Sequence, residues 1–293
     1  MNRRSAFDYQ SDLFDELSRE GWLLLSLGDS TEVEAFFDIS ESLCRSFRPS
    51  IFRSEFNHLR NDGSVSFTPV GKKEILGHAE RSYFELCRAP DLCFFYRLSP
   101  MPIGLHGGEL VIARGSDLVD LLPIPFVDRL KEELLVYRMK WRPERWQMEF
   151  VSDQVDYVEK ILLEKKISFY WSGNVLCLEW PFCPFRESWS SMRCEFSNGI
   201  LAHLNYIPND VPGFSQIYVN VDNGIFWENR ESIDEADISS LINAYRRVSF
   251  CPNMRVGDVL ILDNTRVLHG REAGSSEVGL ETICRFGYMF DSF

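Results

Sequence analysis

Three residues that lie far apart in the sequence have the chemistry of a metal site. His78 and Glu80 are separated by a single residue, Ala79, and His269 follows much later, near the end of the segment GDVLILDNTRVLHGRE. Two imidazoles and one carboxylate are the set that holds a non-haem Fe(II) on one face and leaves the opposite face open to further ligands. In an extended strand, residues i and i+2 project to the same side, so we expect His78 and Glu80 to contact one metal while Ala79 points away.

The H-x-E triplet alone is a weak signal, because such triplets arise by chance and are usually solvated surface pairs. For His269 the alternative is a histidine that ends a strand and binds no metal. The order of the motifs favours the metal: the triplet is followed by Gly107-Gly108-Glu109, by an apolar strand ending in His269, and by Arg285. The chain has five histidines (58, 78, 106, 203 and 269), so few other ligand sets can be assembled.

Arg285 stands in the apolar segment ETICRFGYMF, where strand alternation places Ile283, Arg285 and Gly287 on one side. A buried guanidinium without an anion costs several kcal/mol. A bound dicarboxylate, held by two parallel hydrogen bonds, is one possible partner, and an internal Asp or Glu is the other. The Gly107-Gly108 pair predicts a bend or a close backbone approach beside a strand, since glycine tolerates the required dihedrals.

Bulk composition excludes several classes of protein. The 293 residues are 45% hydrophobic and 14% aromatic, which is ample for a packed core. A net charge of −13 argues against a general nucleic-acid surface, which needs clustered Lys and Arg. Eight cysteines without a C-x-x-C pair are expected to be free thiols in a reducing cytosol. No signal-like segment or apolar run of about 18 residues is present. We therefore expect a cytoplasmic protein with neither nucleic acid nor membrane as a partner.

No repeat or linker divides the chain, so we expect one domain over 1–293, in which 1–70 is a mixed α/β part that packs on a β-rich remainder. Segments with helical apolar spacing are 126–139 and 236–250, and segments with strand composition are 91–100 and 190–206.

Several of these segments carry a family likeness. GHAERSYFELCRAPDLCFFYRLSP followed by GGEL is similar to a ligand strand, an aromatic strand and a Gly-Gly-acid turn. RCEFSNG resembles a Phe-Asn segment, and IDEADISSLINAYRRVSFCPNMRVGDVLILDNTRVLHGRE matches a helix, a Gly-Asp strand and an Asp-Asn…His-Gly-Arg block. From about Gly77 onward the chain thus resembles the TauD/TfdA branch of the Fe(II)/2-oxoglutarate-dependent oxygenases. Within that branch it is most similar to the SyrP-like group, which is associated with hydroxylation of amino acids in natural-product assembly.

The resemblance implies a mainly β fold with flanking helices and a double-stranded β-helix (jelly-roll, cupin-like) core. It assigns Fe(II) to His78, Glu80 and His269, the C5 carboxylate of 2-oxoglutarate to Arg285, and O2 as the second co-substrate. The family often has Thr where this chain has Leu110, and the turn after His269 is longer than is usual in the family. Arg271 is therefore a second candidate for a carboxylate contact. Further candidates for substrate binding are Arg81, Glu109 and Asn198.

The resemblance also implies the reaction, which is hydroxylation of an unactivated C–H bond in an amino-acid-like or natural-product precursor, with release of succinate and CO2. That small-molecule substrate is either free or tethered to a carrier protein. Related halogenases have a small residue at the carboxylate position, so Glu80 disfavours chlorination. Desaturation, epoxidation or cyclisation on the same iron is the first alternative. A jelly-roll binding protein without catalysis is the second. The identity of the substrate and the oligomeric state are not encoded in any motif of the sequence.

Overall fold

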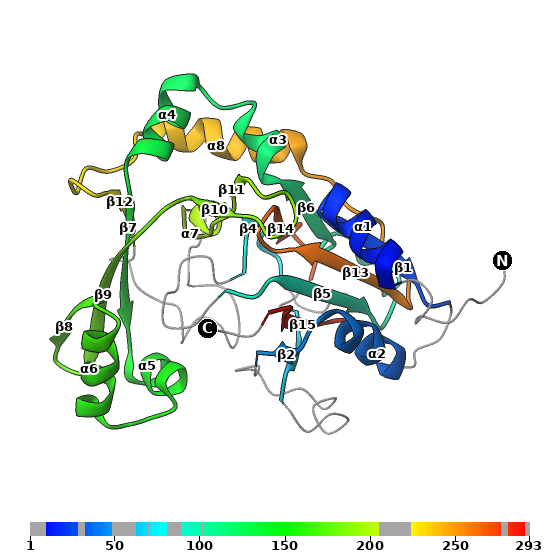
Figure 1. The fold of residues 1–293 in the computed structure, drawn as a ribbon, viewed down its shortest axis with the longest axis horizontal. Coiled ribbons are helices and arrows are strands. Elements are labelled where there is room, and N and C mark those ends of the chain that lie inside the picture. The colour runs from blue at the N-terminus through cyan, green and yellow to red at the C-terminus, as the bar shows by residue number, and fades with distance from the viewer. Residues whose placement is uncertain are drawn as a thin grey trace.

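The computed structural model describes residues 10–28, 33–48, 63–68, 71–80, 89–100, 102–204, 224–276 and 281–290. Its core consists of two antiparallel sheets that face each other (Figure 1). The larger sheet has the order β1-β13-β5-β15-β2, with β3 also paired to β15. Its strands are β1 (Trp22–Ser26), β2 (Ser46–Phe47), β3 (Val65–Phe67), β5 (Leu92–Arg97), β13 (Asp258–Asp263) and β15 (Thr282–Tyr288).

The smaller sheet has the order β4-β14-β6 and consists of β4 (Ile75–His78), β14 (Val267–Arg271) and β6 (Leu110–Arg114). A buried apolar cluster fills the space between the two sheets. Its members from the larger sheet include Phe95 and Cys284, and those from the smaller sheet include Ile112 and Val267. This β-rich core with helices outside it confirms the predicted fold class.

Helices cover the outer face of each sheet. The larger sheet carries α1 (Gln10–Glu20) and α2 (Val33–Leu43), whose apolar side chains pack with Leu92, Phe94 and Tyr96 of β5. The smaller sheet is covered by α3 (Gly115–Val119), α7 (Ile200–Leu204) and α8 (Glu235–Val248). Side chains alternate along β5, so its even-numbered residues contact the helices and its odd-numbered residues face the other sheet. Because both faces are covered, β5 is buried along its whole length.

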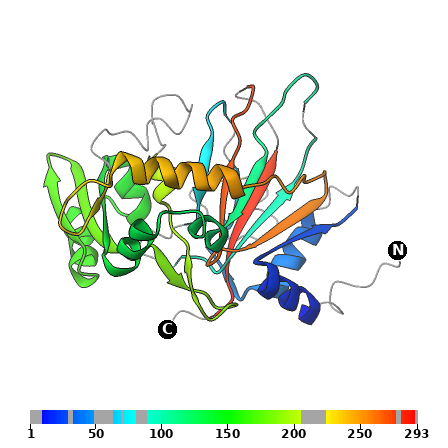
Figure 2. The same ribbon diagram turned by 90° about the horizontal axis from the view of Figure 1, so that it is seen from above.

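A second group of elements extends from the core (Figure 1). Its four-stranded sheet has the order β12-β7-β9-β8. These strands are β7 (Leu135–Trp141), β8 (Ser168–Ser172), β9 (Val175–Phe182) and β12 (Gly224–Trp227), and the helices beside them are α4 (Ile124–Glu132), α5 (Pro143–Phe150) and α6 (Val155–Glu164). A hairpin of β10 (Phe185–Glu187) and β11 (Cys194–Phe196) leads back to the core. Figure 2 shows α8 running from this group to the smaller sheet.

Most of the expected elements are confirmed, and two need correction. The strand in 91–100 and the helix in 236–250 form as predicted, and Leu241 and Tyr245 of the helix are buried. The helix expected over 126–139 ends at Glu132, because LVYRMKW alternates between buried and half-buried residues at the strand period and forms β7. The strand expected over 190–206 ends at Phe196 and is followed by α7. Among the described helices, none is long and apolar enough to span a membrane.

Candidate active site

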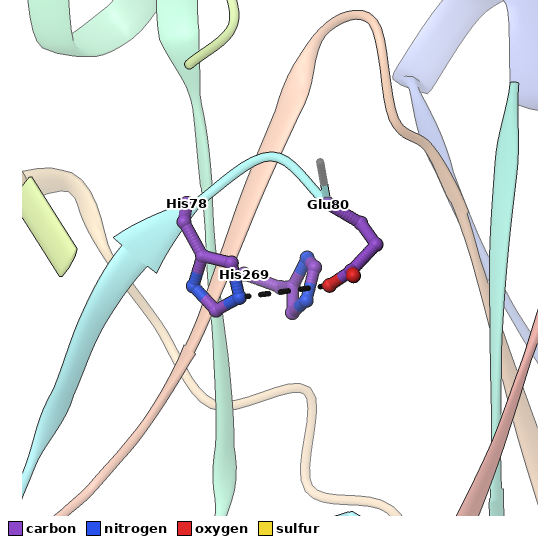
Figure 3. Close-up of side chains that lie close together, drawn as sticks. All are labelled: His78, Glu80 and His269. Carbon is purple, nitrogen blue, oxygen red and sulfur yellow. Dashed lines mark ion pairs between the residues drawn. The ribbon is translucent and has the colours of Figure 1, made fainter. Parts of the chain in front are cut away.

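The three predicted metal ligands come together between the two sheets. His78 ends β4 and is the direct cross-strand partner of His269 on β14, with ring centroids 4.4 Å apart. Glu80 follows two residues after His78, and its Oε2 lies 3.9 Å from His78 Nε2. One donor atom from each of the three residues lies within 4.8 Å of the others (Figure 3). Ala79 is fully buried in the core on the other side, as predicted.

The donor chemistry of this cluster fits a divalent cation. Burial, and secondarily the neighbouring His78, lowers the pKa of His269 well below its usual value, so this imidazole is neutral and able to donate a lone pair. Its buried Nδ1 has no hydrogen-bond partner among the described residues. Nδ1 of His78 lies 3.3 Å from the Leu76 carbonyl oxygen, which can only accept a hydrogen bond. The Nδ1 proton therefore faces that oxygen, and Nε2 of His78 is available as a ligand.

The environment of the Glu80 carboxyl disfavours its charged form. Burial raises the pKa of Glu80, and His78 opposes that shift. A divalent ion would favour the deprotonated form much more strongly than an imidazole does. Arg48 also contacts this group, with Nη1 3.7 Å from Glu80 Oε1. No motif drew attention to Arg48, which directly follows the two-residue strand β2.

Asn264 fixes the backbone of Glu80. Its side-chain oxygen accepts a hydrogen bond of 2.7 Å from the Glu80 N–H, and its Nδ2 donates to the carbonyl oxygens of Glu80 at 3.0 Å and of Pro90 at 2.9 Å. Asn264 is fully buried in the turn between β13 and β14. The sequence could have indicated this role, because Asp263 and Asn264 end an apolar strand, where buried polar side chains must find partners inside the protein. Asn264 is therefore a positioning residue for the carboxylate.

The two histidine strands are also set by close contact with α8. A Cβ added at Gly77 would lie 2.3 Å from Cε2 of Tyr245, and one added at Gly270 would lie 2.7 Å from its hydroxyl oxygen. Each glycine directly adjoins one of the two histidines, so the Tyr245 ring lies on the backbone behind both ligands. The predicted close approach at Gly107 is confirmed too. Its φ is +74°, and a Cβ there would lie 2.0 Å from the Ala273 carbonyl oxygen.

Arg285 is not where the sequence placed it, and this is a correction. It points to the helix side of the larger sheet, where Nε donates to Ser64 Oγ at 2.7 Å and Nη1 to Ser40 Oγ at 2.8 Å. Nη1 also forms an ion pair of 3.1 Å with Glu41, and the guanidinium stacks on Phe47. The neighbouring residue Cys284 faces the space between the sheets instead. The predicted alternation of side chains along β15 is correct, but the side that carries Ile283 and Arg285 faces the helices and not the metal site.

The other predicted contacts have mixed outcomes. Arg271 lies two residues from His269 on the same face of β14, and its guanidinium donates to the carbonyl oxygens of Gly71 and Lys73. The carboxyl of Glu109 lies beside that of Glu272, whose pKa is raised first by burial and then by Glu109. Arg81 lies outside the described residues.

Asn198 needs correction as a substrate contact, because both polar atoms of its side chain are used within the fold. Nδ2 donates to the Pro184 carbonyl oxygen at 2.9 Å, and Oδ1 accepts from the N–H of Ile200 at the start of α7. Its own carbonyl oxygen accepts a hydrogen bond from the N–H of Ala79, between the two ligands of the triplet. Asn198 therefore holds the ligand segment in place rather than pointing into the site.

One side of the centre faces the group of elements outside the core. His203 on α7 is half-buried, and burial lowers its pKa to about 3, with His78 as the second cause. Its ring lies 4.8 Å from that of Tyr137 on β7. Arg145 and Glu149 on α5 form an ion pair of 2.5 Å with side chains only 6% and 3% exposed, and both act on the pKa of Glu80. These polar residues of α5 and α7 thus lie close enough to the cluster to interact electrostatically with its ligands.

Comparison with known proteins agrees with this geometry. Residues 23–281 match the model of the taurine catabolism dioxygenase TauD, TfdA family. No curated protein matches the chain. Similar solved structures include PvcB from Pseudomonas aeruginosa, which is 12% identical with a TM-score of 0.55 over 95% of this chain and 79% of that one. An asparagine oxygenase in complex with Fe(II), 3-hydroxyasparagine and succinate is 13% identical, with a TM-score of 0.55 over 97% and 80%. A taurine dioxygenase from Burkholderia xenovorans is 12% identical, with a TM-score of 0.55 over 97% and 81%.

At these identities the solved structures establish the shared fold, whereas the family match covers most of the chain and includes all three residues of the His-Glu-His cluster. This chain therefore belongs to the TauD/TfdA family of Fe(II)- and 2-oxoglutarate-dependent dioxygenases.

Proposed function

We propose that His78, Glu80 and His269 hold the Fe(II) of this dioxygenase, and that it hydroxylates an unactivated C–H bond of an amino-acid-like or natural-product precursor. The observation that carries the proposal is the convergence of one atom from each of these residues within 4.8 Å. A complete carboxylate ligand in Glu80 favours hydroxylation over halogenation. When bound, Fe(II) and 2-oxoglutarate supply the oxidising chemistry, in which O2 is consumed and succinate and CO2 are released.

The chain's own residues have three tasks in this reaction. The histidines and Glu80 bind the metal on one face, while Asn264 and the Tyr245 contact keep those ligands in place. The apolar cluster between the sheets excludes water from the centre. The substrate has to be oriented so that one C–H bond faces the metal, and the elements on the α5 and α7 side are placed to do this.

The charges around Glu80 favour a substrate that carries both signs of charge. Arg48 lies 3.7 Å from Glu80, and the buried Arg145–Glu149 pair lies close enough to act on the same carboxylate. An amino acid offers a carboxylate to a cation of this set and an ammonium group to an anion. The asparagine oxygenase of similar fold was solved with 3-hydroxyasparagine, so this architecture accommodates a hydroxylated amino acid. We propose this substrate class, in the manner of the SyrP-like group, either free or attached to a carrier protein.

The test has two stages. First, Fe(II) and 2-oxoglutarate are added to the protein without oxygen, and the weak visible charge-transfer band is compared between the wild type and His269→Ala. A band that disappears in the variant supports the metal assignment, whereas a folded, iron-loaded wild type without a band contradicts it. Second, free and carrier-tethered amino acids are screened for succinate formation and product mass. A gain of one oxygen atom supports hydroxylation, and a loss of two hydrogens indicates desaturation instead.

A further inference from the structure

Arg97 is the last residue of β5 and faces the space between the two sheets. Strand alternation puts Cys93, Phe95 and Arg97 on this face. The Phe95 ring lies 5.1 Å from that of His269. Arg97 therefore stands one step, about 6.6 Å, further along the same face from a residue that contacts a metal ligand.

This arginine is buried, and among the described residues no counter-ion contacts it. Arg97 is only 6% exposed, and its Nε has no hydrogen-bond partner in the part of the chain that the structure describes. Within the described part of the chain its guanidinium forms no hydrogen bond or ion pair. Burial lowers its pKa, and the carboxylates of Glu109 and Asp258 oppose that shift without contacting the guanidinium. A guanidinium in this position needs an anion, because an uncompensated buried charge is strongly destabilising.

Three other arginines on or beside these strands, which the sequence or the site brought into question, already have partners. Arg285 binds Glu41, Arg48 lies against Glu80, and Arg271 donates to backbone carbonyl oxygens. On β15, the residue directly opposite Arg97 is Thr282, which is also buried. Thr282 lies on the same face as Cys284, so its hydroxyl faces the space between the sheets beside Arg97. A hydroxyl and a guanidinium thus stand side by side on the face that looks into the space between the sheets. Leu110, the position at which the family often has a threonine, packs against the apolar cluster in the same space.

We propose that Arg97, assisted by Thr282, binds the distal carboxylate of 2-oxoglutarate, in place of Arg285, to which the family resemblance assigned it. The inference rests on the proposed metal site, since 2-oxoglutarate chelates the metal with its other end. The planar fork of a guanidinium matches a carboxylate with two parallel hydrogen bonds. The two cross-strand partners then supply donors to one carboxylate, and the ligand lies along the face that runs from His269 past Phe95 to Arg97.

The test compares two ligands that differ only at the distal end. Calorimetry on Mn(II)-loaded protein, without oxygen, measures the Kd of 2-oxoglutarate and of 2-oxobutanoate, which lacks the distal carboxylate. The wild type is expected to prefer 2-oxoglutarate. Arg97→Met should weaken 2-oxoglutarate by at least about thirtyfold, the loss typical of truncating one partner of a buried charge pair, and leave 2-oxobutanoate within about threefold. Arg97→Lys should fall between these values, because it keeps the charge but loses the fork.

Arg285→Met is the matched control, and it should keep the wild-type preference between the two ligands. Thr282→Val, which conserves shape, should weaken 2-oxoglutarate several-fold, and together with Arg97→Lys it carries the test if Arg97→Met does not fold. A preference that survives in the Arg97 variants, or collapses in Arg285→Met, overturns this inference alone. A metal-loaded wild type that binds neither 2-oxo acid overturns the proposed function as well.

Discussion

Replacing Asn264 by alanine should weaken metal binding without touching any ligand. The Asn264 side chain makes three hydrogen bonds of 2.7–3.0 Å, two to the backbone of Glu80 and one to that of Pro90. All three are buried at the asparagine, and alanine supplies neither donor nor acceptor. With about 1 kcal/mol for each bond, and more where a buried group is left unsatisfied, the variant should lose roughly 3–5 kcal/mol of unfolding free energy.

The effect on the metal has a separate cause. Without the Asn264 clamp, Glu80 is held to the fold mainly through its chain neighbours, so its carboxylate must be ordered when the ion binds. Loss of a contact behind a metal ligand typically weakens affinity by about 10–100-fold, which corresponds to ~1.4–2.7 kcal/mol. Urea denaturation of the metal-free protein measures the first effect, and calorimetric titration with Mn(II) measures the second.

The matched control is Asn229→Ala. Asn229 also accepts one backbone hydrogen bond, from the N–H of Glu231. This bond lies in an exposed turn after β12 of the four-stranded sheet, and not in the sheet that carries the histidines. This variant should lose less than about 1 kcal/mol and bind Mn(II) like the wild type. If folded Asn264→Ala binds Mn(II) within twofold of the wild type, the reasoning is refuted, because Glu80 would then be positioned by something other than this clamp.

Three further outcomes follow from the same contacts. Gly77→Ala should cost about 1–3 kcal/mol, because the added Cβ would lie 2.3 Å from the Tyr245 ring, and Tyr245→Leu in the same chain should restore part of the loss in thermal denaturation. A hundredfold excess of Mn(II) over its Kd should stabilise the wild type by about 2.7 kcal/mol and leave His269→Ala unchanged; equal stabilisation of both would contradict the assigned ligands. Cys183 is exposed, whereas burial raises the pKa of Cys284 to about 12, so a thiol reagent at neutral pH should modify Cys183 much faster, with mass spectrometry of peptides as the measurement.

The metal cluster could be predicted from the sequence because its information is local. His78 and Glu80 sit at i and i+2, and only a strand-like segment can aim both at one ion while Ala79 enters the core. The sequence predicted one buried strand ending in His269, but the structure divides this segment into β13 and β14, which lie in different sheets. The shorter β14 is the strand that pairs His269 with His78. The spacing of the triplet and the apolar run before His269 are short-range patterns, which a sequence displays directly.

The supporting residues could not be found in the same way, because their partners are remote in sequence. Asn264 meets Glu80 only after β13 and β4 have been placed in different sheets. Arg48 follows a strand of two residues, too short to display a period. The helix expected beyond Glu132 was wrong for a related reason. A short apolar segment can fit the spacing of a helix or of a strand, and here pairing with the neighbouring strand β9 makes it a strand.

Arg285 and Arg97 show why the presence of an arginine in the expected segment does not identify the residue that binds the co-substrate. β15 is almost entirely buried, so apolar residues on both of its faces conceal which face looks to the metal. A shift of one residue along the strand decides whether Arg285 or Cys284 faces the space between the sheets. The contacts of each guanidinium indicate which arginine is available to bind an anion. A cation already balanced by Glu41 and two serine hydroxyls would have to break those contacts before it could bind a ligand, whereas Arg97 has no such contact to lose. An anion that enters between the sheets is therefore attracted to a guanidinium that contacts no carboxylate among the described residues, and this difference in contacts, rather than position in the last strand, is the reason to expect the co-substrate at Arg97.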